Sequence, residues 1–550
     1  MAAIMTETMT VLALFAMLSV AVGSVSSGLA DISAACQASQ FPEACQASLM
    51  NTPLVGKRAA AEEIVKTAIG LSLDGVHESY RLSDSILAGA TASHNFNLTV
   101  AAQGCLESMS SAMRTISRSS AVSLDRMSGV KDGRAWMSAA LTYEYDCYSG
   151  LNRQNRSDLS STVQQINSTM TLTSTALSMV AAIDTYGRDM KLWRPPRTER
   201  SASSSATGNF LTSGSEERES FFDMHSHGVE LLPNVTVCLE DKTCEYSSIQ
   251  RAVDGAPDYS QKVFVIYIKA GIYREIVRVG PSKMNLMFVG DGMDRTVITG
   301  SMNALQPGVG TYGSATVGVN ADGFVARDIT FDNSAGPQMS QAVSLRVDSD
   351  LSVFHRCAIV GHQDTLYAHT LRQFYSNCRI EGTVDFIFGN AAVVFRNSTI
   401  LIRPRLVPSK FGETSPITAH GRLDPGQSTG FVLDKCIING TEDYMNDFFA
   451  NPQIHKAYLG RPWKLYSRTI VMRSYIGELI RPDGWQPWDG TFALDTLFYG
   501  EFENYGPRAD FSARVPWSTQ ISPLAVGIYS PQSFIQADHW LPFILSNYLD

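Results

Sequence analysis

Runs rich in Lys and Arg are missing from this 550-residue sequence. It has 44 Lys and Arg against 53 Asp and Glu, a formal net charge of −9, and no Lys or Arg before Lys57. Proteins that bind DNA or RNA neutralise phosphates with clustered cations, so the composition argues against a nucleic-acid partner. The length is too great for one ordinary core and predicts two domains with appendages.

Long apolar runs are scarce as well. One lies in residues 1–30, where TVLALFAMLSVAVG is followed by small residues, a pattern typical of a signal peptide or signal anchor. No later stretch is apolar enough to span a bilayer. Because the flank carries Glu7 and lacks the usual positive charge, cleavage and anchoring both stay open. We expect a secreted protein.

Metal-binding motifs are also absent. None of the nine cysteines forms a CxxC pair, which argues against a zinc site. His362 and His369 lie at a spacing that no common metal motif uses, so a surface or packing role is favoured for both. We expect no metal and no cofactor.

The cysteines fit an oxidising compartment, with several disulfides and at least one free thiol. Cys36 and Cys45 are close enough to staple a helical hairpin, and Cys238 and Cys244 bracket a tight loop. The disulfide candidates are Cys36, Cys45, Cys105, Cys147, Cys238, Cys244, Cys357 and Cys378. Cys436 has no evident partner.

Six N-x-S/T sequons also suit a chain that crosses the secretory pathway. They begin at Asn97, Asn155, Asn167, Asn234, Asn397 and Asn439. Asn397 lies in a strand-like run, where burial would prevent its modification.

One segment of the sequence is written twice. Within GHQDTLYAHTLRQFYSNCRIEGTVDFIFG (361–389), Asp364 and Asp385 are 21 residues apart. The pairs Gly361/Gly382, Ile359/Ile380 and Cys357/Cys378 have the same spacing.

The repeat is better explained by strands than by a helical hairpin, which could also hold 21 residues. Runs such as SVFHRCAIVG and VVFRNSTILI are rich in β-formers and broken by Asn, Asp and Gly. The motif F-x-x-C-x-I recurs as F-x-x-S-x-I at 395–400, and Gln341 precedes Gln363 by 22 residues. The spacing predicts stacked coils of a β-solenoid, in which Cys357 and Cys378 either pair or form a ladder.

The repeat also predicts a pair of carboxylates. Equivalent positions on adjacent coils lie roughly 4.8 Å apart, which places Asp364 next to Asp385. Two like charges there repel by roughly 3 kcal/mol at an effective dielectric near 20, on the order of two pKa units. One carboxyl group should keep its proton while the other ionises, which supplies an acid beside a nucleophile or base. The alternative is a solvated ladder of aspartates at solenoid turns.

The chain divides into four stretches. After residues 1–30, residues 31–190 are rich in Ala, Leu, Met and Ser with helical periodicity, which predicts a helix bundle. Residues 191–228 are rich in Ser, Pro, Gly and charge and form a linker. Residues 229–550 begin with a short capping helix near 249–253 and continue strand after strand.

Five ordered blocks of residues 229–550 resemble the signature blocks of plant pectin methylesterases. They are GIYRE (271–275), QAVSL (341–345), GHQDTLY (361–367), DFIFG (385–389) and LGRPW (459–463). The resemblance implies an all-β domain folded as a right-handed parallel β-helix. It also implies an esterase that hydrolyses the methyl esters of homogalacturonan to pectate and methanol.

The same resemblance assigns roles. Ionised Asp385 attacks the ester carbonyl, Asp364 protonates methoxide and later deprotonates water, and the Gln341 and Gln363 amides steady the oxyanion. The resemblance further implies that Arg461 binds Asp385, that Trp463 offers a face to a sugar ring, and that Thr311 contacts substrate. Without the family, Arg461 could be a structural ion pair, Trp463 a core aromatic, and the glutamines an amide ladder.

Residues 31–190 resemble the invertase/pectin methylesterase inhibitor family, through DGRAWMSAALTYEYDC (132–147). This resemblance implies an all-α four-helix bundle in which Cys36 pairs with Cys45 and Cys105 with Cys147. The bundle is then a possible inhibitor of the enzyme, within the chain or in trans. The basic, dileucine cleavage motif of the family is absent, and Arg194, Arg197 and Arg200 form the nearest basic cluster.

Three other interpretations compete. The protein could be a non-catalytic wall-binding or inhibitory protein that acts through its helices, or a pectate lyase, which uses calcium and a basic residue. Gly426–Gly430 also fits the G-x-S-x-G of serine hydrolases, but a polar turn precedes it and a strand follows, the reverse of what that motif needs.

Overall fold

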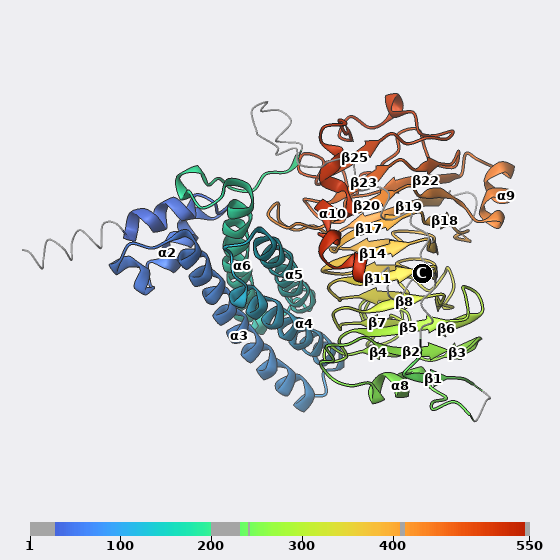
Figure 1. Ribbon diagram of the computed structural model, residues 1–550, viewed down its shortest axis with the longest axis horizontal. Coiled ribbons are helices and arrows are strands. Elements are labelled where there is room, and N and C mark those ends of the chain that lie inside the picture. Colours follow the sequence, from blue (N-terminus) through green and yellow to red (C-terminus); the bar gives the residue numbers. More distant parts are fainter. Residues whose placement is uncertain (1–27, 200–231, 240–242, 407–412, 545–550) are drawn as a thin grey trace, which may run out of the picture. The chain divides into compact units, whose positions relative to one another are not determined.

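The structure is a computed structural model that describes residues 28–199, 232–239, 243–406 and 413–544 (Figure 1). The expected signal segment and most of the expected linker lie outside the described residues. The chain splits into two compact units, Met1–Arg197 with Asp424–Gln427, and Thr198–Leu423 with Ser428–Asp550. Among the described helices, none is both long and apolar enough to cross a membrane.

The first unit is helical, as predicted. Four long helices pack against one another, and a short helix, α2 (Pro42–Leu49), precedes them. The long helices are α3 (Ala61–Ala92), α4 (Phe96–Ala121), α5 (Met127–Asn152) and α6 (Ser160–Tyr186). Asn95 starts α4, because its side chain accepts a hydrogen bond from the Leu98 backbone N–H at 3.2 Å and so caps the helix.

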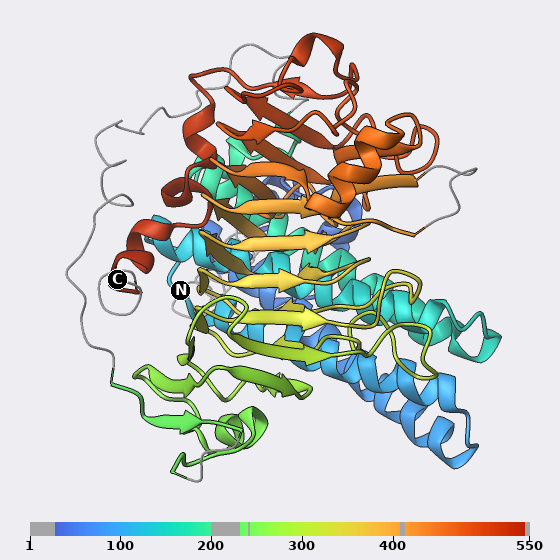
Figure 2. The ribbon, with the colours of Figure 1, turned by 90° about the vertical axis from the view of Figure 1, so that its right-hand side faces the viewer.

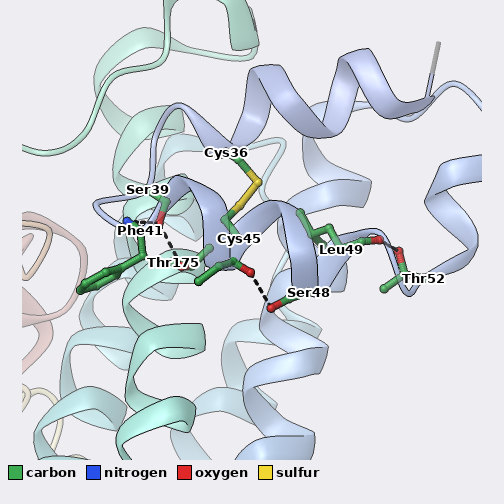
Figure 3. Close-up of a disulfide and its surroundings, with 9 residues drawn as sticks. Cys36, Ser39, Phe41, Cys45, Ser48, Leu49, Thr52 and Thr175 are labelled. Atoms are coloured by element: carbon green, nitrogen blue, oxygen red, sulfur yellow. Dashed lines mark hydrogen bonds between the residues drawn. A yellow bond between two sulfur atoms is a disulfide. The ribbon is translucent and has the colours of Figure 1, made fainter. Parts of the chain in front are cut away.

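Two disulfides tie the helical unit together. Cys36 bonds to Cys45 on α2, and Cys105 on α4 bonds to Cys147 on α5, which confirms both predicted pairings. Figure 3 shows the first of these beside the hydrogen bond between the Ser39 and Thr175 hydroxyls, 3.0 Å long. Both disulfides join segments that lie far enough apart to restrict the unfolded chain, which stabilises the bundle.

The interior of the helical unit is unusually polar. Buried hydroxyls pair between helices, as in Ser72 with Thr173 at 2.6 Å and Ser79 with Thr169 at 3.1 Å. The Thr173 hydroxyl also donates to Glu144 at 2.6 Å, and Glu144 is 0% exposed. Burial raises the pKa of Glu144 to about 8, although the Thr173 hydrogen bond opposes the shift. Glu144 is therefore a neutral acid in the folded bundle at acidic and neutral pH.

The raised pKa of Glu144 predicts that alkaline pH destabilises the helical unit. The unfolded chain loses this proton near pH 4.5 and the folded chain near pH 8. The contribution is fully present below about pH 4.5 and is lost progressively up to about pH 8, because only the unfolded state releases the proton in that window. We expect the helical circular-dichroism signal of the full chain to melt at a lower temperature at pH 8 than at pH 5.

Glu144→Gln should remove much of this pH dependence, because an amide of the same shape does not titrate. The exposed Glu107→Gln on α4 is the matched control and should keep the wild-type dependence. A pH dependence of melting that is the same in Glu144→Gln and wild type would contradict the assignment.

The second unit is a parallel β-helix, which confirms the predicted fold class. Its strands form three sheets in which each described pair of neighbouring strands is parallel, and Figure 2 shows them stacked as successive coils. One sheet has 11 strands: β1 (Val235–Val237), β2 (Phe264–Ile268), β5 (Leu286–Gly290), β8 (Val325–Arg327), β11 (Ser352–His355), β14 (Arg372–Ser376), β17 (Ala392–Arg396), β20 (Gly430–Asp434), β23 (Arg468–Met472), β25 (Phe498–Phe502) and β26 (Thr519–Gln520).

The other two sheets complete each coil. The 7-stranded sheet contains β4 (Val277–Val279), β7 (Val317–Val319), β10 (Leu345–Val347), β13 (Leu366–Ala368), β16 (Ile387–Gly389), β19 (Glu413–His420) and β22 (His455–Gly460). The 8-stranded sheet contains β3 (Gly271–Arg274), β6 (Thr296–Gly300), β9 (Thr330–Asn333), β12 (Ala358–Val360), β15 (Arg379–Gly382), β18 (Thr399–Ile402), β21 (Ile437–Gly440) and β24 (Tyr475–Ile476).

The 21-residue repeat sets the register of the coils. Ile359 pairs with Ile380, and Ile380 pairs with Ile400, along the interior of β12, β15 and β18. In the neighbouring sheet, Tyr375 stacks on Phe354 at 4.7 Å and on Phe395 at 4.9 Å. These ladders belong to one buried core, so the repeated apolar residues hold successive coils in a fixed register.

The cysteines of the β-helix are only partly paired. Cys238 and Cys244 form the predicted disulfide. Cys357 and Cys378, candidates for a further disulfide, are instead free and buried, as is Cys436. Each thiol points into the coil interior toward main-chain oxygens, with Cys357 Sγ 3.5 Å from Ala326 O, and the cysteines form the alternative ladder.

Short helices flank the coils. At one end, α8 (Ile249–Gly255) buries Ile249, Ala252 and Val253, as expected of a cap, and Glu275 accepts hydrogen bonds from its first backbone N–H groups. Further short helices are α9 (Glu442–Ala450), α10 (Pro531–Phe534) and α11 (Leu541–Ile544). Phe534 and Leu541 pack on the outer face of the 11-stranded sheet.

The structure contradicts the prediction for one turn segment and agrees with the prediction for another. Asn397, expected to be buried, is exposed, because it has a left-handed φ of 50° in the turn between β17 and β18. Asn397 thus belongs to a turn between two strands and not to the strand-like run itself. The G-x-S-x-G segment at 426–430 is a turn that leads into β20, as its sequence context indicates.

Candidate active site

The repeated segment brings Asp364 and Asp385 to equivalent positions on adjacent coils. Each aspartate lies two residues before a strand, β13 or β16, and Leu366 pairs with Ile387 across these strands. Asp364 donates its backbone N–H to Val384 O at 3.1 Å, on the same coil as Asp385. Both have left-handed φ values, 61° and 50°, and both are under 10% exposed. The sharp turn therefore presents two buried carboxyl groups side by side.

The surrounding charges affect the pKa of the two carboxyl groups differently. Burial and the charge of Asp385 raise the pKa of Asp364 well above its usual range, and Arg461 opposes this only in part. Burial raises the pKa of Asp385 too, but a hydrogen bond and the charge of Arg461 favour its ionised form. Arg461 therefore favours ionisation of Asp385 over ionisation of Asp364.

Arg461 binds Asp385 with both ends of its guanidinium. Its Nε donates to Oδ1 at 2.8 Å, and Nη2 donates to Oδ2 at 2.6 Å. The guanidinium also lies over the ring of Trp488, 4.4 Å from its centroid. This contact limits the orientations open to Arg461, so the carboxylate of Asp385 is held in one plane.

The two glutamines lie on neighbouring coils beside the aspartates. The backbone N–H of Ala342, next to Gln341, donates to Gln363 O at 3.1 Å. Both side chains are half-buried, and the Gln341 amide oxygen accepts from the Ser340 hydroxyl at 2.6 Å. That bond leaves the amide N–H groups of Gln341 as the donors it can offer a ligand. Thr311 is half-buried in the loop before β7.

A row of aromatic rings continues from the aspartates. Tyr367 stacks on Phe388 at 4.2 Å, Phe388 meets Trp463 edge-on at 6.1 Å, and Tyr312 meets Tyr367 edge-on at 6.4 Å. Successive strand residues face opposite ways, so Tyr367 lies outside the coil while Leu366 lies in the core. Tyr367 and Phe388 are under 10% exposed, so the half-buried rings of Tyr312 and Trp463 are the ones that can pack on a sugar ring.

Two family models match this chain. The one described as Pectinesterase matches residues 234–538, which is more than half of the chain, and the one described as Plant invertase/pectin methylesterase inhibitor matches residues 30–179. The chain belongs to the pectinesterase family. It is a pectinesterase by fold and by sequence, and its activity is the removal of methyl esters from pectin.

Individual relatives agree with this assignment. The chain is 47% identical to probable pectinesterase/pectinesterase inhibitor 64 of Arabidopsis thaliana, over 93% of this chain and 84% of the relative. It is 36% identical to pectinesterase 3 of Citrus sinensis, over 93% and 86%. Among solved structures, pectin methylesterase from carrot superposes with a TM-score of 0.54 and 48% identity, covering 57% of this chain and 97% of the carrot chain.

Some residues of the pectinesterase site were not singled out from the sequence. Phe388 follows Tyr367 by 21 residues, so the repeat itself carried the signal for the stacked pair. Tyr312 and Trp488 lie outside the repeat, and no local spacing points to them. His369 has a packing role, since it is buried and hydrogen-bonds Asp348, whereas His362 is half-buried. Among the described residues, no cluster of three or more His, Cys, Asp or Glu could hold a metal ion.

Proposed function

We propose that Asp385 is the nucleophile and Asp364 the general acid and base of this pectin methylesterase. The observation that carries the proposal is the two-pronged Arg461–Asp385 ion pair beside a buried Asp364 whose pKa is raised. A carboxylate attacks only when ionised, and a leaving methoxide needs a proton.

The reaction proceeds in two halves. An oxygen of Asp385 attacks the carbonyl carbon of the methyl ester, and the amide N–H groups of Gln341 and Gln363 stabilise the oxyanion. Asp364 gives its proton to the departing methoxide, which leaves as methanol. Asp364 then takes a proton from water as the water attacks the acyl carbon. The sugar carboxylate departs and Asp385 is restored.

Substrate binding uses the aromatic row and the half-buried residues beside it. Trp463 packs on a ring of methyl-esterified homogalacturonan, and Thr311 contacts the same chain. Trp463 lies close against the coil because position 421 is glycine, where an added Cβ would meet its ring at 2.8 Å. The site of action is the cell wall, which the N-terminal apolar segment and the sequons support; Asn397 is exposed to modification.

Methanol release from methyl-esterified pectin tests the proposal. The purified full chain should release methanol and leave a polysaccharide that has no new unsaturated ends. Unsaturated ends would indicate a lyase, and absence of methanol from a folded chain would favour the wall-binding or inhibitory alternative. Chelation of divalent ions should leave the rate unchanged, because each step uses side chains of this protein.

The helical unit is a candidate intramolecular inhibitor. Its match to inhibitors of the same enzyme class supports masking, and its covalent connection to the β-helical unit keeps it at high effective concentration. We expect the Val229–Asp550 domain to release methanol faster than the intact chain, and the separate helical unit to slow it only at higher concentration. Equal specific activity of the intact chain and the domain would reject masking and favour a role in folding or export.

A further inference from the structure

The β-helical unit begins at Thr198, directly after Arg197, the last residue of the first stretch of the helical unit. Thr198 is 6% exposed, and Glu199 beside it is half-buried, so these residues are built into the second unit, to which they belong. The Oε1 atom of Glu199 lies 2.7 Å from Arg468 Nη2, and its Oε2 atom lies 3.7 Å from Arg422 Nη1. One carboxylate therefore faces two guanidinium groups.

Both arginines are anchored in the coils. Arg422 follows the last residue of β19 by two positions, and Arg468 is the first residue of β23. Their side chains are only 1% and 8% exposed. Two buried guanidinium groups repel one another and have lost much of their hydration, so a carboxylate placed between them is strongly favoured.

The neighbouring titratable groups do not add negative charge. His420 accepts a hydrogen bond from the Arg468 backbone N–H at 3.1 Å through Nδ1. Burial and the two arginines hold the pKa of His420 well below its usual range, so its ring is neutral. Burial and Glu199 raise the pKa of Tyr529, which keeps its phenol neutral. His420 and Tyr529 therefore add no negative charge beside the two arginines, and Glu199 supplies the carboxylate.

We propose that Arg422 and Arg468 form a carboxylate-binding site of the β-helical unit, which the chain fills in cis with Glu199. The site is other than the Asp364–Asp385 pair and takes no part in ester hydrolysis. Its ligand class is a single carboxylate, and its role is to fasten the chain at Thr198 and Glu199 to the coils.

The position of a proteolytic cut then decides whether Glu199 stays with the esterase fragment or with the helical fragment. A cut before residue 198 leaves the carboxylate on the esterase, whereas a cut after residue 199 leaves it on the helical fragment and empties the site. A chain that begins at Val229 lacks Glu199, so its stability reports the empty site.

The test is chemical rescue in the full chain. Glu199→Ala should lower the melting temperature of the β-helix by roughly 2–6 °C. Acetate at neutral pH should raise the melting temperature of this variant again, and the effect should saturate with acetate concentration. Chloride at equal ionic strength should not raise it. Glu199→Gln fills the space with an amide and should be destabilised without rescue. The exposed Glu478→Ala is the matched control and should melt like wild type in either salt.

Two results would overturn the proposal: a Glu199→Ala chain that melts like wild type, or a loss that chloride reverses as well as acetate does. Shorter chains give an independent measurement. Thr198–Asp550 should have a higher melting temperature than Val229–Asp550. Acetate should reduce the difference between the two melting temperatures. Equal melting of the two in chloride would also contradict the site. None of these measurements uses the esterase reaction, so they stand apart from the catalytic roles of the aspartates.

Discussion

Asp385→Asn is expected to abolish methanol release, with a loss of about 10⁴-fold or more, while the β-helix stays folded. An amide has the shape of the carboxyl group but cannot act as a carboxylate nucleophile. Asparagine also tolerates the left-handed φ of 50° at this position, so the turn should survive. Methanol release and the melting curve of the same preparation measure the two outcomes.

Asp328→Asn is a matched control within the same unit. Asp328 also has a left-handed φ, 60°, and also binds an arginine in two-pronged fashion, with Arg356 Nε and Nη2 at 2.7 and 2.9 Å from its oxygens. It differs from Asp385 in lying away from the aspartate pair in the register of the coils. Its amide variant should retain activity. Normal turnover by Asp385→Asn would refute the nucleophile assignment.

The fold follows from the sequence to the extent that its signals are local and repeated. A coil of 21 residues returns the chain to the same place, so Ile359, Ile380 and Ile400 form the ladder that their spacing predicts. The same arithmetic places Asp364 beside Asp385. Spacing alone left the state of Cys357 and Cys378 open, because stacked interior positions suit a ladder of thiols as well as a disulfide.

The rest of the site depends on contacts between distant segments. Arg461 reaches Asp385 from the segment after β22, and neither the ion pair nor its distance can be read from the repeat. Only resemblance to a family indicated that partner. Trp488 contacts Arg461 from a loop without regular structure, and Glu199 pairs with Arg468 across about half of the chain. These contacts are products of tertiary packing, for which the local sequence carries no period.

Electrostatic roles were predictable only in part. Proximity of two aspartates predicts that one keeps its proton, but it does not say which. In the structure Arg461 bonds both oxygens of Asp385, and the charges of Arg461 and Arg405 favour its ionised form, whereas Asp364 receives only the charge of Arg461. The two chemically identical groups thus differ through arginines that lie on other segments of the chain.

Asp364→Asn is expected to lower turnover by about 10²–10⁴-fold, through loss of proton transfer rather than loss of the nucleophile. In wild type, raising the pH removes the proton that Asp364 holds because of burial and the charge of Asp385, and methoxide then leaves without an acid. Activity should therefore fall on the alkaline side as Asp364 ionises and on the acid side as Asp385 is protonated. The amide of the variant cannot ionise, so the alkaline fall should disappear from its residual rate.

The leaving group separates this role from a structural one. An ester whose alcohol leaves without protonation, such as a nitrophenyl ester, needs the acid much less than a methyl ester does. Asp364→Asn should therefore lose less rate with it in the first half of the reaction, and should stall afterwards because no base activates water. An early burst of nitrophenol with an acyl group retained on Asp385 is the expected result. A pH profile of unchanged shape, with equal losses for both esters, would instead mean that Asp364 only holds the turn in place.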